Sequence, residues 1–517
     1  MADRLTAFRV EAPNETNAAV GSGERWCLGA VLAVAAALRI WHLGSLPFEQ
    51  DELYTLRDAI DFGASAGEGP GILGRPLYYL LQHVLLAVAP AGPLYLRAPA
   101  FLFGVLGVLA TWWAGRRMIG PAAGLAAAAF VALSPWHLYH SQFARYWTLL
   151  YLLATCAFAV LPAALAGKRG APVVFVLLSL AAALTHPTFL FALAGAAAGA
   201  TAVSGTGRVR LPIPSRSALI GVWLPLLAPL AAWYGYVRLL DGGRALRNPG
   251  GATAESVVRV IPAMAQWLGP TMVAAAVLGL FVLWGAPGRR EREVGRERGP
   301  QREAHTADGA ARRGIRADAP WGRLVAAMCA GGVLSTLVLL LAAGSRTTVY
   351  ADYGTAALPL VFLGAGAAAQ FAAARAGQPS ALAFAALVIA GILPQTLSHM
   401  TDGTRFDFRP AHEAIRESRA DAPVVAWPII VHRYYAPDLT VVEADGDPAT
   451  YELALAESGG FWAISAVRRR GVVPGGRAAE DWIDAHCRRE ERWESRRLDY
   501  RRYAVELAWC ARTRGTG

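Results

Sequence analysis

The chain has 517 residues, of which 55% are hydrophobic, and it carries a formal net charge of +11. This length exceeds one ordinary domain, and several apolar runs of about 20 residues predict a polytopic α-helical membrane protein. The runs lack the two-residue alternation of membrane β-strands, which excludes a β-barrel. The positive charge does not predict nucleic-acid binding, because its excess lies in loops between the apolar runs.

Eleven apolar runs are predicted to span the membrane, whereas a twelfth is not. The eleven ranges are 26–44, 97–115, 121–138, 148–166, 171–185, 187–203, 217–238, 266–285, 322–343, 354–374 and 380–397. The twelfth, 76–90, has an apolar core of about 15 residues, which suits a helix lying on the membrane surface better than a span. With eleven spans, the most basic loops all fall on one side, which the positive-inside rule makes cytoplasmic.

This topology divides the chain into three parts. Residues 1–25 form a cytoplasmic N-terminal tail, and residues 26–397 form the transmembrane region, whose first run is not followed by a cleavage site. Within that region, residues 45–96 form an outer loop with surface helices. Residues 286–320 form a charged, Gly- and Arg-rich cytoplasmic loop whose composition predicts disorder. Residues 398–517 are expected to form a small extracytoplasmic α/β domain.

The C-terminal part alternates two kinds of predicted element. Its helix-like stretches are 410–419 and 478–491, and its strand-like stretches are 423–427, 440–443, 461–466 and 503–510. Cys487 and Cys510 both lie in this part, where they form either a disulfide, if the domain is extracytoplasmic, or two free thiols. No spacing of cysteines and histidines resembles a zinc site.

Polar residues gather at the predicted outer boundary of the membrane. The groups are Glu49, Asp51, Glu52 and Tyr54; Arg75, Tyr78 and Tyr79; His140, Gln142, Arg145 and Tyr146; His186; and Tyr350, Asp352 and Tyr353. Carboxylates facing lipid cost several kcal/mol, so Asp51 and Glu52 are expected at the water boundary, as the catalytic mouth of a membrane enzyme. The alternative is that they merely solvate a loop.

The other polar residues also have simpler interpretations. The tyrosines fit an interfacial aromatic belt, and Arg75 and Arg97 could extend to lipid headgroups. His186, directly before Pro187, could satisfy a helix end. Arg145, at the outer end of a span, runs against the positive-inside trend, which favours an anionic partner.

The order of these motifs resembles the GT-C glycosyltransferases. The likeness rests on Asp51-Glu52 after the first span, Arg75-Pro76-Leu77-Tyr78-Tyr79, Arg97-Ala98-Pro99, Gly115-Arg116-Arg117, and Ser134-Pro135 followed by Ser141-Gln142-Phe143-Ala144-Arg145. It is closest to the bacterial branch similar to dolichyl-phosphate-mannose protein mannosyltransferases and lipid A aminoarabinose transferases. It covers residues 26 to about 200 well and 320–400 loosely.

The resemblance implies transfer of a sugar, with inversion, from a polyprenyl-phosphate carrier to an acceptor hydroxyl at the outer face of a bacterial cytoplasmic membrane. It makes Asp51 the general base, with Glu52 holding the acceptor or the base in place. The donor phosphate would be bound by Arg75, Arg145, His186 and Tyr353. The further substrate-binding residues would be Tyr54, Tyr78, Tyr79, His140, Gln142, Tyr146, Tyr350 and Asp352. The sugar, and whether the acceptor is a glycan, a lipid or a protein, stay open.

Three departures from the family pattern bear on the chemistry. Relatives often carry His-Pro-Pro at Arg75-Pro76-Leu77, an acid at Phe143 and an arginine at Asp352. The missing acid argues against a bound Mg²⁺ or Mn²⁺ ion, and no other cofactor is expected. The two arginine changes suggest that phosphate-binding charge has moved from position 352 to position 75. The alternatives to an enzyme are a flippase for a lipid-linked saccharide, which would place charges at mid-bilayer, or an inactive assembly subunit.

Overall fold

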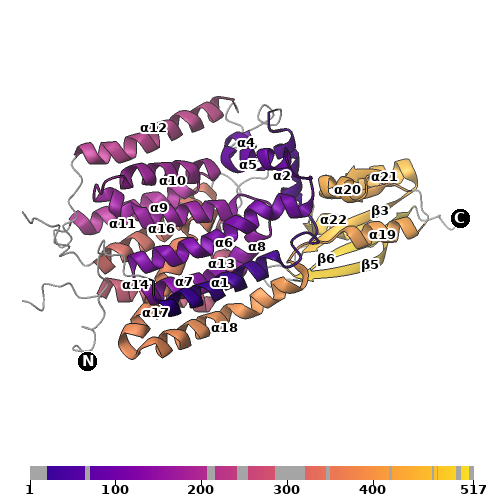
Figure 1. Cartoon of the computed structure of the whole chain (residues 1–517). Coiled ribbons are helices and arrows are strands. Elements are labelled where there is room, and N and C mark those ends of the chain that lie inside the picture. The colour runs from indigo at the N-terminus through magenta and orange to yellow at the C-terminus, as the bar shows by residue number, and fades with distance from the viewer. Residues whose placement is uncertain are drawn as a thin grey trace, which may run out of the picture.

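The computed structural model describes residues 20–63, 70–205, 216–240, 254–285, 321–344, 350–418, 422–468, 471–473, 476–496 and 502–511. A bundle of long apolar helices makes up most of the molecule, and a C-terminal α/β unit sits at one end of the bundle (Figure 1). The predicted disordered loop 286–320 lies outside the described residues, as does most of the N-terminal tail.

Helices occupy each of the eleven ranges expected to span the membrane. They are α1 (Ser22–Ile40), α6 (Pro93–Met118), α7 (Pro121–Leu133), α9 (Trp147–Leu165), α10 (Ala171–Thr185), α11 (Phe189–Gly205), α12 (Arg216–Leu240), α14 (Pro270–Gly285), α16 (Trp321–Gly344), α17 (Leu358–Ala376) and α18 (Gln378–Asp402). Within the described ranges, five helices are long and apolar enough to cross a membrane, or up to seven if each of two bent pairs is one span. A count of eleven spans therefore stays a prediction.

Two bends shorten spans that the sequence predicts as continuous. Pro135 ends the first run, and α8 (Pro135–Ser141) turns away from α7 by 62°. Proline has no N–H, so the carbonyl of Val131 loses its helical donor. The guanidinium of Arg39 replaces it, donating from Nη2 to Val131 O at 3.1 Å and from Nη1 to Ala132 O at 3.0 Å.

The second bend lies at Gly269, whose φ of +81° favours glycine. Here α13 (Ala254–Leu268) and α14 meet at 92°. The first residues of the predicted span 266–285 therefore belong to a separate helix.

In the described residues of the predicted outer loop 45–96, three short helices lie at the end of the bundle that carries the C-terminal unit (Figure 1). They are α2 (Gln50–Ile60), α4 (Pro70–Leu73) and α5 (Pro76–Leu86). A capping box starts α2, with the Glu52 carboxylate accepting from Glu49 N at 3.2 Å. The 11 residues of α5 rise about 16 Å, roughly half a bilayer core, so this helix is too short to span.

The C-terminal unit contains a six-stranded mixed sheet with the order β2-β1-β3-β6-β5, and β4 pairs with β3. The strands are β1 (Val424–Ala426), β2 (Val441–Glu443), β3 (Gly460–Arg468), β4 (Gly471–Val473), β5 (Cys487–Arg496) and β6 (Arg502–Ala511). The helices are α19 (Arg409–Glu417), α20 (Ile429–Tyr435), α21 (Pro448–Ser458) and α22 (Gly476–His486). β2, β1 and β3 run parallel, whereas β6 is antiparallel to β3 and β5 is antiparallel to β6.

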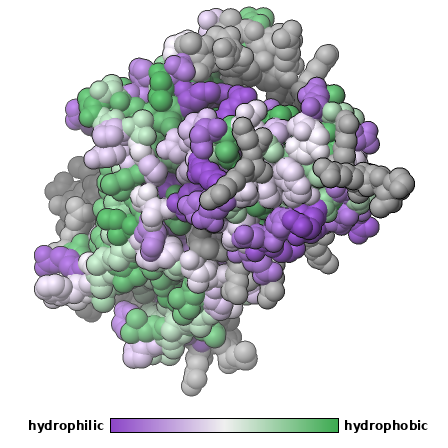
Figure 2. All heavy atoms as spheres, turned by 90° about the vertical axis from the view of Figure 1, so that its right-hand side faces the viewer, coloured by the Kyte–Doolittle hydropathy of each residue, from purple (hydrophilic) through white to green (hydrophobic). Residues whose placement is uncertain are grey.

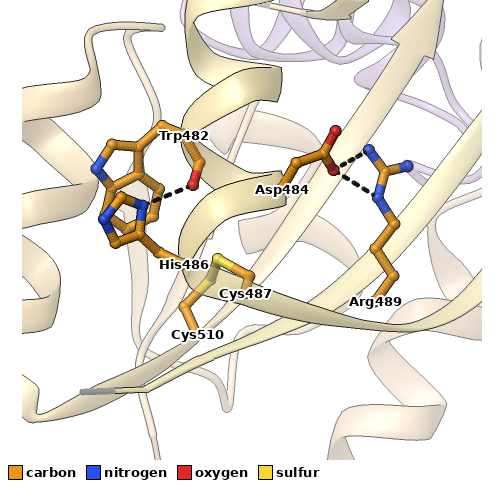
Figure 3. Close-up of a disulfide and its surroundings, with 6 residues drawn as sticks. All are labelled: Trp482, Asp484, His486, Cys487, Arg489 and Cys510. Atoms are coloured by element: carbon orange, nitrogen blue, oxygen red, sulfur yellow. Dashed lines mark hydrogen bonds and ion pairs between the residues drawn. A yellow bond between two sulfur atoms is a disulfide. The ribbon is translucent and has the colours of Figure 1, made fainter. Parts of the chain in front are cut away.

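One predicted element of this unit is wrong at its C-terminal end. The expected helix 478–491 ends at His486, and Cys487 begins strand β5. Cys487 lies opposite Cys510 in the β5–β6 register, and the two form a disulfide (Figure 3). Two residues after the cysteine, Arg489 of β5 donates from Nε to Oδ1 of Asp484 in α22 at 2.9 Å. Pairing with β6, the next strand along the chain, overrides the helix propensity of this Arg- and Glu-rich stretch.

Candidate active site

The centre of the site is an ion pair between α2 and the loop that joins α8 to α9. Arg145 Nη2 lies 3.3 Å from Asp51 Oδ2, and Arg145 Nη1 donates to Tyr79 Oη at 3.0 Å. The side chain of Asp51 is 52% exposed, whereas that of Arg145 is only 11% exposed. An accessible carboxylate therefore stands beside a cation that the protein holds in place.

A second arginine approaches Arg145 across one aromatic ring. The guanidinium carbons of Arg75 and Arg145 lie 5.1 and 5.2 Å from the centre of the Tyr146 ring, and Arg75 also donates to the Tyr146 hydroxyl. Burial lowers the pKa of Arg145, but Tyr79 and then Asp51 outweigh burial, so the net shift is upward and the group stays charged. Two cations that converge on one ring form a place for an anion.

His186 and Tyr353 lie beside the Tyr146 ring and, together with it, form an aromatic wall of the site. The His186 ring stacks on Tyr146 at 5.1 Å and lies 5.3 Å from the Tyr353 ring, while Nδ1 pairs with Thr188 Oγ1 at 2.8 Å. Burial, followed by the charges of Arg75 and Arg145, holds the pKa of His186 well below its usual value. His186 is therefore neutral, and it offers a ring and a polar atom to the site without adding positive charge.

His140 and Asp352 face each other on another side of this wall. His140 Nε2 lies 3.2 Å from Asp352 Oδ1, but the contact lacks hydrogen-bond geometry. Among the described residues, neither ring nitrogen of His140 nor Asp352 Oδ1 has a hydrogen-bond partner, although all three atoms are buried. The rings of Trp147 and Trp267 lie 5.7 and 6.1 Å from the His140 ring. Buried polar atoms without partners, next to aromatic rings, are suited to bind a polar ligand.

Two predicted site residues have their polar atoms engaged inside the protein. Glu52 is fully buried, and Arg97 donates to its two carboxylate oxygens from Nε and Nη2 at 2.8 Å each. Gln142 Nε2 donates to Trp41 O at 2.7 Å, and Gln142 Oε1 pairs with His399 Nε2 at 2.7 Å. These residues join the elements that carry the site, and their side chains are not presented to solvent.

The remaining predicted residues lie at the edges of the cluster. Tyr78 is buried behind it, with its hydroxyl accepting from Gln82 Nε2 at 2.8 Å and its ring edge-on to Tyr146 at 6.3 Å. Tyr350 is 56% exposed, and its ring lies 5.9 Å from that of Tyr353. Tyr54 is half-buried on α2, where its hydroxyl accepts from Gln50.

Sequence reasoning misplaced Arg97 and missed two further residues of this region, Arg405 and Trp267. Arg97 does not extend to lipid headgroups, because its side chain is fully buried against Glu52. Arg405, which follows α18, donates to the same carboxylate. Trp267 ends α13 beside His140. The motif around Arg97 was visible in the sequence, but Arg405 and Trp267 reach the site only through the tertiary fold.

The question of a divalent cation concerns the side chains that could act as ligands. No group of three or more His, Cys, Asp or Glu side chains in the described ranges is placed to hold a metal ion. At position 143, where an acid would have been a candidate ligand, the Phe143 ring stacks on Tyr139 at 5.3 Å.

No protein-family model and no curated protein matches the chain. Solved structures do match. ArnT from Cupriavidus metallidurans in the apo state is 14% identical, with a TM-score of 0.53 over 94% of this chain and 98% of that chain. The same protein bound to undecaprenyl phosphate is 13% identical, with a TM-score of 0.52 over the same shares. The chain has a GT-C-like fold. A more distant match is the apo oligosaccharyltransferase of Archaeoglobus fulgidus, 14% identical, with a TM-score of 0.48 over 86% of this chain and 69% of that chain.

The GT-C-like fold and the apolar helices together make the chain a multi-pass helical membrane protein. Within this fold, helix α2, which carries Asp51, lies at the bundle end that carries the C-terminal unit (Figure 1). Figure 2 views the molecule from that end, where hydrophilic side chains gather in the centre of the face.

Proposed function

We propose that this protein is an inverting glycosyltransferase that moves a sugar from a polyprenyl-phosphate carrier to an acceptor hydroxyl. The observation that carries the proposal is the half-exposed Asp51 carboxylate held 3.3 Å from Arg145, with Arg75 across the Tyr146 ring. A base and a phosphate-binding pair of cations are the two components that such a transfer requires. The structure of ArnT with undecaprenyl phosphate, which has the same fold, supports a carrier of that class.

In the proposed reaction, the acceptor oxygen attacks the anomeric carbon while Asp51 takes its proton. The bond from the anomeric carbon to the phosphate oxygen breaks, and the lipid phosphate leaves with the bonding electrons and one more negative charge. Arg145 and Arg75 stabilise that charge, and the hydroxyls of Tyr79 and Tyr146 hold the two guanidiniums in place. Attack from the side opposite the phosphate inverts the anomeric carbon.

The proton and the phosphate charge are coupled through Arg145. In the resting site Arg145 pairs with Asp51. When Asp51 becomes protonated it loses its charge, and Arg145 then interacts more strongly with the departing phosphate. Asp51 loses its charge as the phosphate gains one, and both groups face the guanidinium of Arg145. Arg145 therefore has an anionic partner throughout the reaction.

We assign the sugar to the surface between His140 and Asp352, whose buried polar atoms lack partners among the described residues. Trp147 and Tyr353 would pack against the sugar ring, and the exposed Tyr350 and Tyr54 would contact the acceptor or the carrier. His186 contributes its ring and a neutral polar atom to the phosphate side. Glu52 and Gln142 act by holding the loop of Arg145, and Tyr78 supports the ring of Tyr146.

The site belongs, in this proposal, to the outer face of a bacterial cytoplasmic membrane. The predicted topology of eleven spans would put the site and the C-terminal unit outside, in agreement with the charge of the loops. The Cys487–Cys510 disulfide supports that side, because disulfides persist in oxidising compartments.

The test is purified protein incubated with a panel of undecaprenyl-phosphate sugars and acceptors. The wild type should consume one donor, whereas Asp51→Asn should lose turnover by about 10²- to 10⁴-fold and still bind undecaprenyl phosphate. Asp61→Asn, an exposed acid at the end of the same helix, is the matched control and should turn over normally. Wild-type turnover by Asp51→Asn would contradict the proposal, and movement of lipid-linked saccharide across vesicles without cleavage would favour a flippase.

A further inference from the structure

The segment that connects α18 to the C-terminal unit reaches the base of the site. Arg405 lies in this segment and is 1% exposed. Its Nη1 donates to the Glu52 carboxylate and to Pro47 O at 3.1 Å, and its Nη2 donates to Gln142 O at 2.5 Å. One guanidinium thus contacts the start of α2 and the start of the loop that carries Arg145.

The Glu52 carboxylate forms the second half of this connection. Besides Arg405, it accepts from Arg97 on α6, and its Oε1 accepts from Ala144 N at 2.8 Å. Glu52 follows Asp51 in the chain, and Ala144 precedes Arg145. The hydrogen bond from Ala144 to Glu52 therefore lies directly beneath the Asp51–Arg145 ion pair and fixes the spacing of the two backbones that carry it.

Burial makes this connection stiff. The side chains of Glu52, Arg97 and Arg405 are all fully buried, so each of them depends on the others for its partners. Removing one partner of such a group leaves an uncompensated charge in the interior, which proteins avoid. The three residues consequently hold one arrangement.

The apolar packing follows the same path. Phe48, Leu53 and Leu56, on and before α2, share one hydrophobic cluster with residues of the C-terminal unit such as Phe408 and Val424. Phe48 N also donates to the Tyr435 hydroxyl on α20 at 2.6 Å. The C-terminal unit thus packs on the helix that carries Asp51 and is not a separate attachment.

We propose that Arg405 is a positioning residue for the transfer reaction, acting through Glu52 and Gln142 to hold Asp51 against Arg145. The C-terminal unit then contributes to catalysis through its connecting segment without touching substrate. This inference rests on the proposed function. It adds that the arrangement of the site depends on a residue more than 350 positions away, since Arg405 and Glu52 are separated by 353 residues.

The experiment compares full-length wild type, Arg405→Gln and Arg405→Lys in lipid nanodiscs. The first measurement is amide hydrogen exchange over residues 50–56 and 142–146. Arg405→Gln should raise exchange in the two segments together. Arg405→Lys should restore part of the protection, because it keeps the charge but cannot fork between Glu52 and Gln142. Arg409→Gln is the matched control: Arg409 begins α19 directly after the connecting segment, is 40% exposed and pairs with Asp407.

The second measurement is turnover of the donor that the panel identifies. Arg405→Gln should lower kcat by about 10- to 100-fold with a smaller change in KM, because a displaced base slows the chemical step while Arg75, which Arg405 does not contact, still binds phosphate. Unchanged exchange in both segments, or an unchanged kcat despite a lower melting temperature, would overturn the inference. If the wild type consumes no donor, the proposed function fails but the inference about Arg405 is still tested. Hydrogen exchange reports in either case whether Arg405 holds the two segments. If Arg405→Gln does not fold, Arg405→Lys decides on the same two readouts.

Discussion

If Arg145 binds the phosphate of the carrier, its replacement should weaken carrier binding, which can be measured without following turnover. Replacing Arg145 by Gln removes the cation but leaves a side chain that can still donate to the Tyr79 hydroxyl. Arg75 remains across the Tyr146 ring, so the anion site loses one of its two charges. The carrier should therefore still bind, but less tightly.

The size of the loss follows from the geometry. A hydrogen bond to a charged group contributes about 1.5–3 kcal/mol, and each 1.4 kcal/mol is a factor of ten, so the Kd for undecaprenyl phosphate should rise by about 10- to 150-fold. The side chain of Arg145 is 11% exposed, so solvent weakens its attraction to phosphate less than at the surface. The Asp51–Arg145 interaction stabilises the free protein, and the variant loses this interaction as well. This loss offsets part of the weaker binding, so the rise in Kd should lie toward the lower end of this range.

The assay is equilibrium binding of undecaprenyl phosphate to purified protein in nanodiscs, followed by quenching of tryptophan fluorescence. Trp147 lies against His186 in the site and provides the signal. Arg57→Gln is the control, since Arg57 is another arginine near the site but is 56% exposed and pairs with Asp58. An unchanged Kd for Arg145→Gln, or an equal loss in the control, would refute the assignment of Arg145 to the phosphate.

Two further predictions concern the C-terminal unit. Replacing Cys487 and Cys510 together by Ala should destabilise the unit by about 3 kcal/mol, because the disulfide closes a loop with a sequence separation of 23 residues and so lowers the entropy of the unfolded chain. The loss should appear as increased hydrogen exchange of β5 and β6, and unchanged exchange would contradict this prediction. His412 and His432 pair with each other through Nε2 and Nδ1 at 2.9 Å, and burial lowers their pKa values to about 4 and about 3. Both pKa values are lower in the folded state, so stability is complete above the unfolded pKa of about 6.5 and declines as the pH falls toward 4 and 3, by up to about 1.4 kcal/mol per pH unit for each histidine. Unfolding followed over this pH range should show the decline, His412→Gln should flatten it, and a wild type with equal stability at pH 7 and pH 4.5 would contradict it.

The helices and the centre of the site were accessible from the sequence for clear reasons. Long runs of Ala, Leu and Val need no partner to be recognised as membrane helices, and all eleven are helical. The proximity of Asp51 and Arg145 followed from placing two loops at the same membrane boundary. The boundary argument gives only the depth of the two residues in the membrane. The resemblance to GT-C enzymes assigned Asp51 and Arg145 to one reaction and therefore to one site.

What the sequence could not provide depends on tertiary contacts, both between neighbouring strands and between segments far apart in the chain. The Arg- and Glu-rich stretch after Cys487 has good helix formers, and only its pairing with β6 makes it a strand. Glu52 carries the same charge as Asp51 and is its neighbour, yet one carboxylate is fully buried and the other is half-exposed. Burial pulls the pKa of Glu52 upward, but Arg405 and Arg97 outweigh it and lower the pKa to about 2, so this acid is a permanently charged link.

The arginines near the site divide into two kinds according to how their donors are used. Arg39 and Arg97 are fully buried, and their guanidinium groups donate to backbone carbonyls and to the fixed side chains of Ser141 and Glu52. Arg145 differs: its Nη1 donates to Tyr79 Oη at 3.0 Å and its Nη2 lies 3.3 Å from Asp51 Oδ2, but its Nε is buried without a partner among the described residues. Charge and burial alone do not distinguish these groups, because all of them are cations in the interior. An underused donor distinguishes Arg145 from Arg39 and Arg97, because a buried N–H without a partner costs free energy that an incoming phosphate oxygen recovers. Arg405 Nε also lacks a partner among the described residues, so for Arg405 the distinction comes from its full burial and its contacts with Glu52, Pro47 and Gln142.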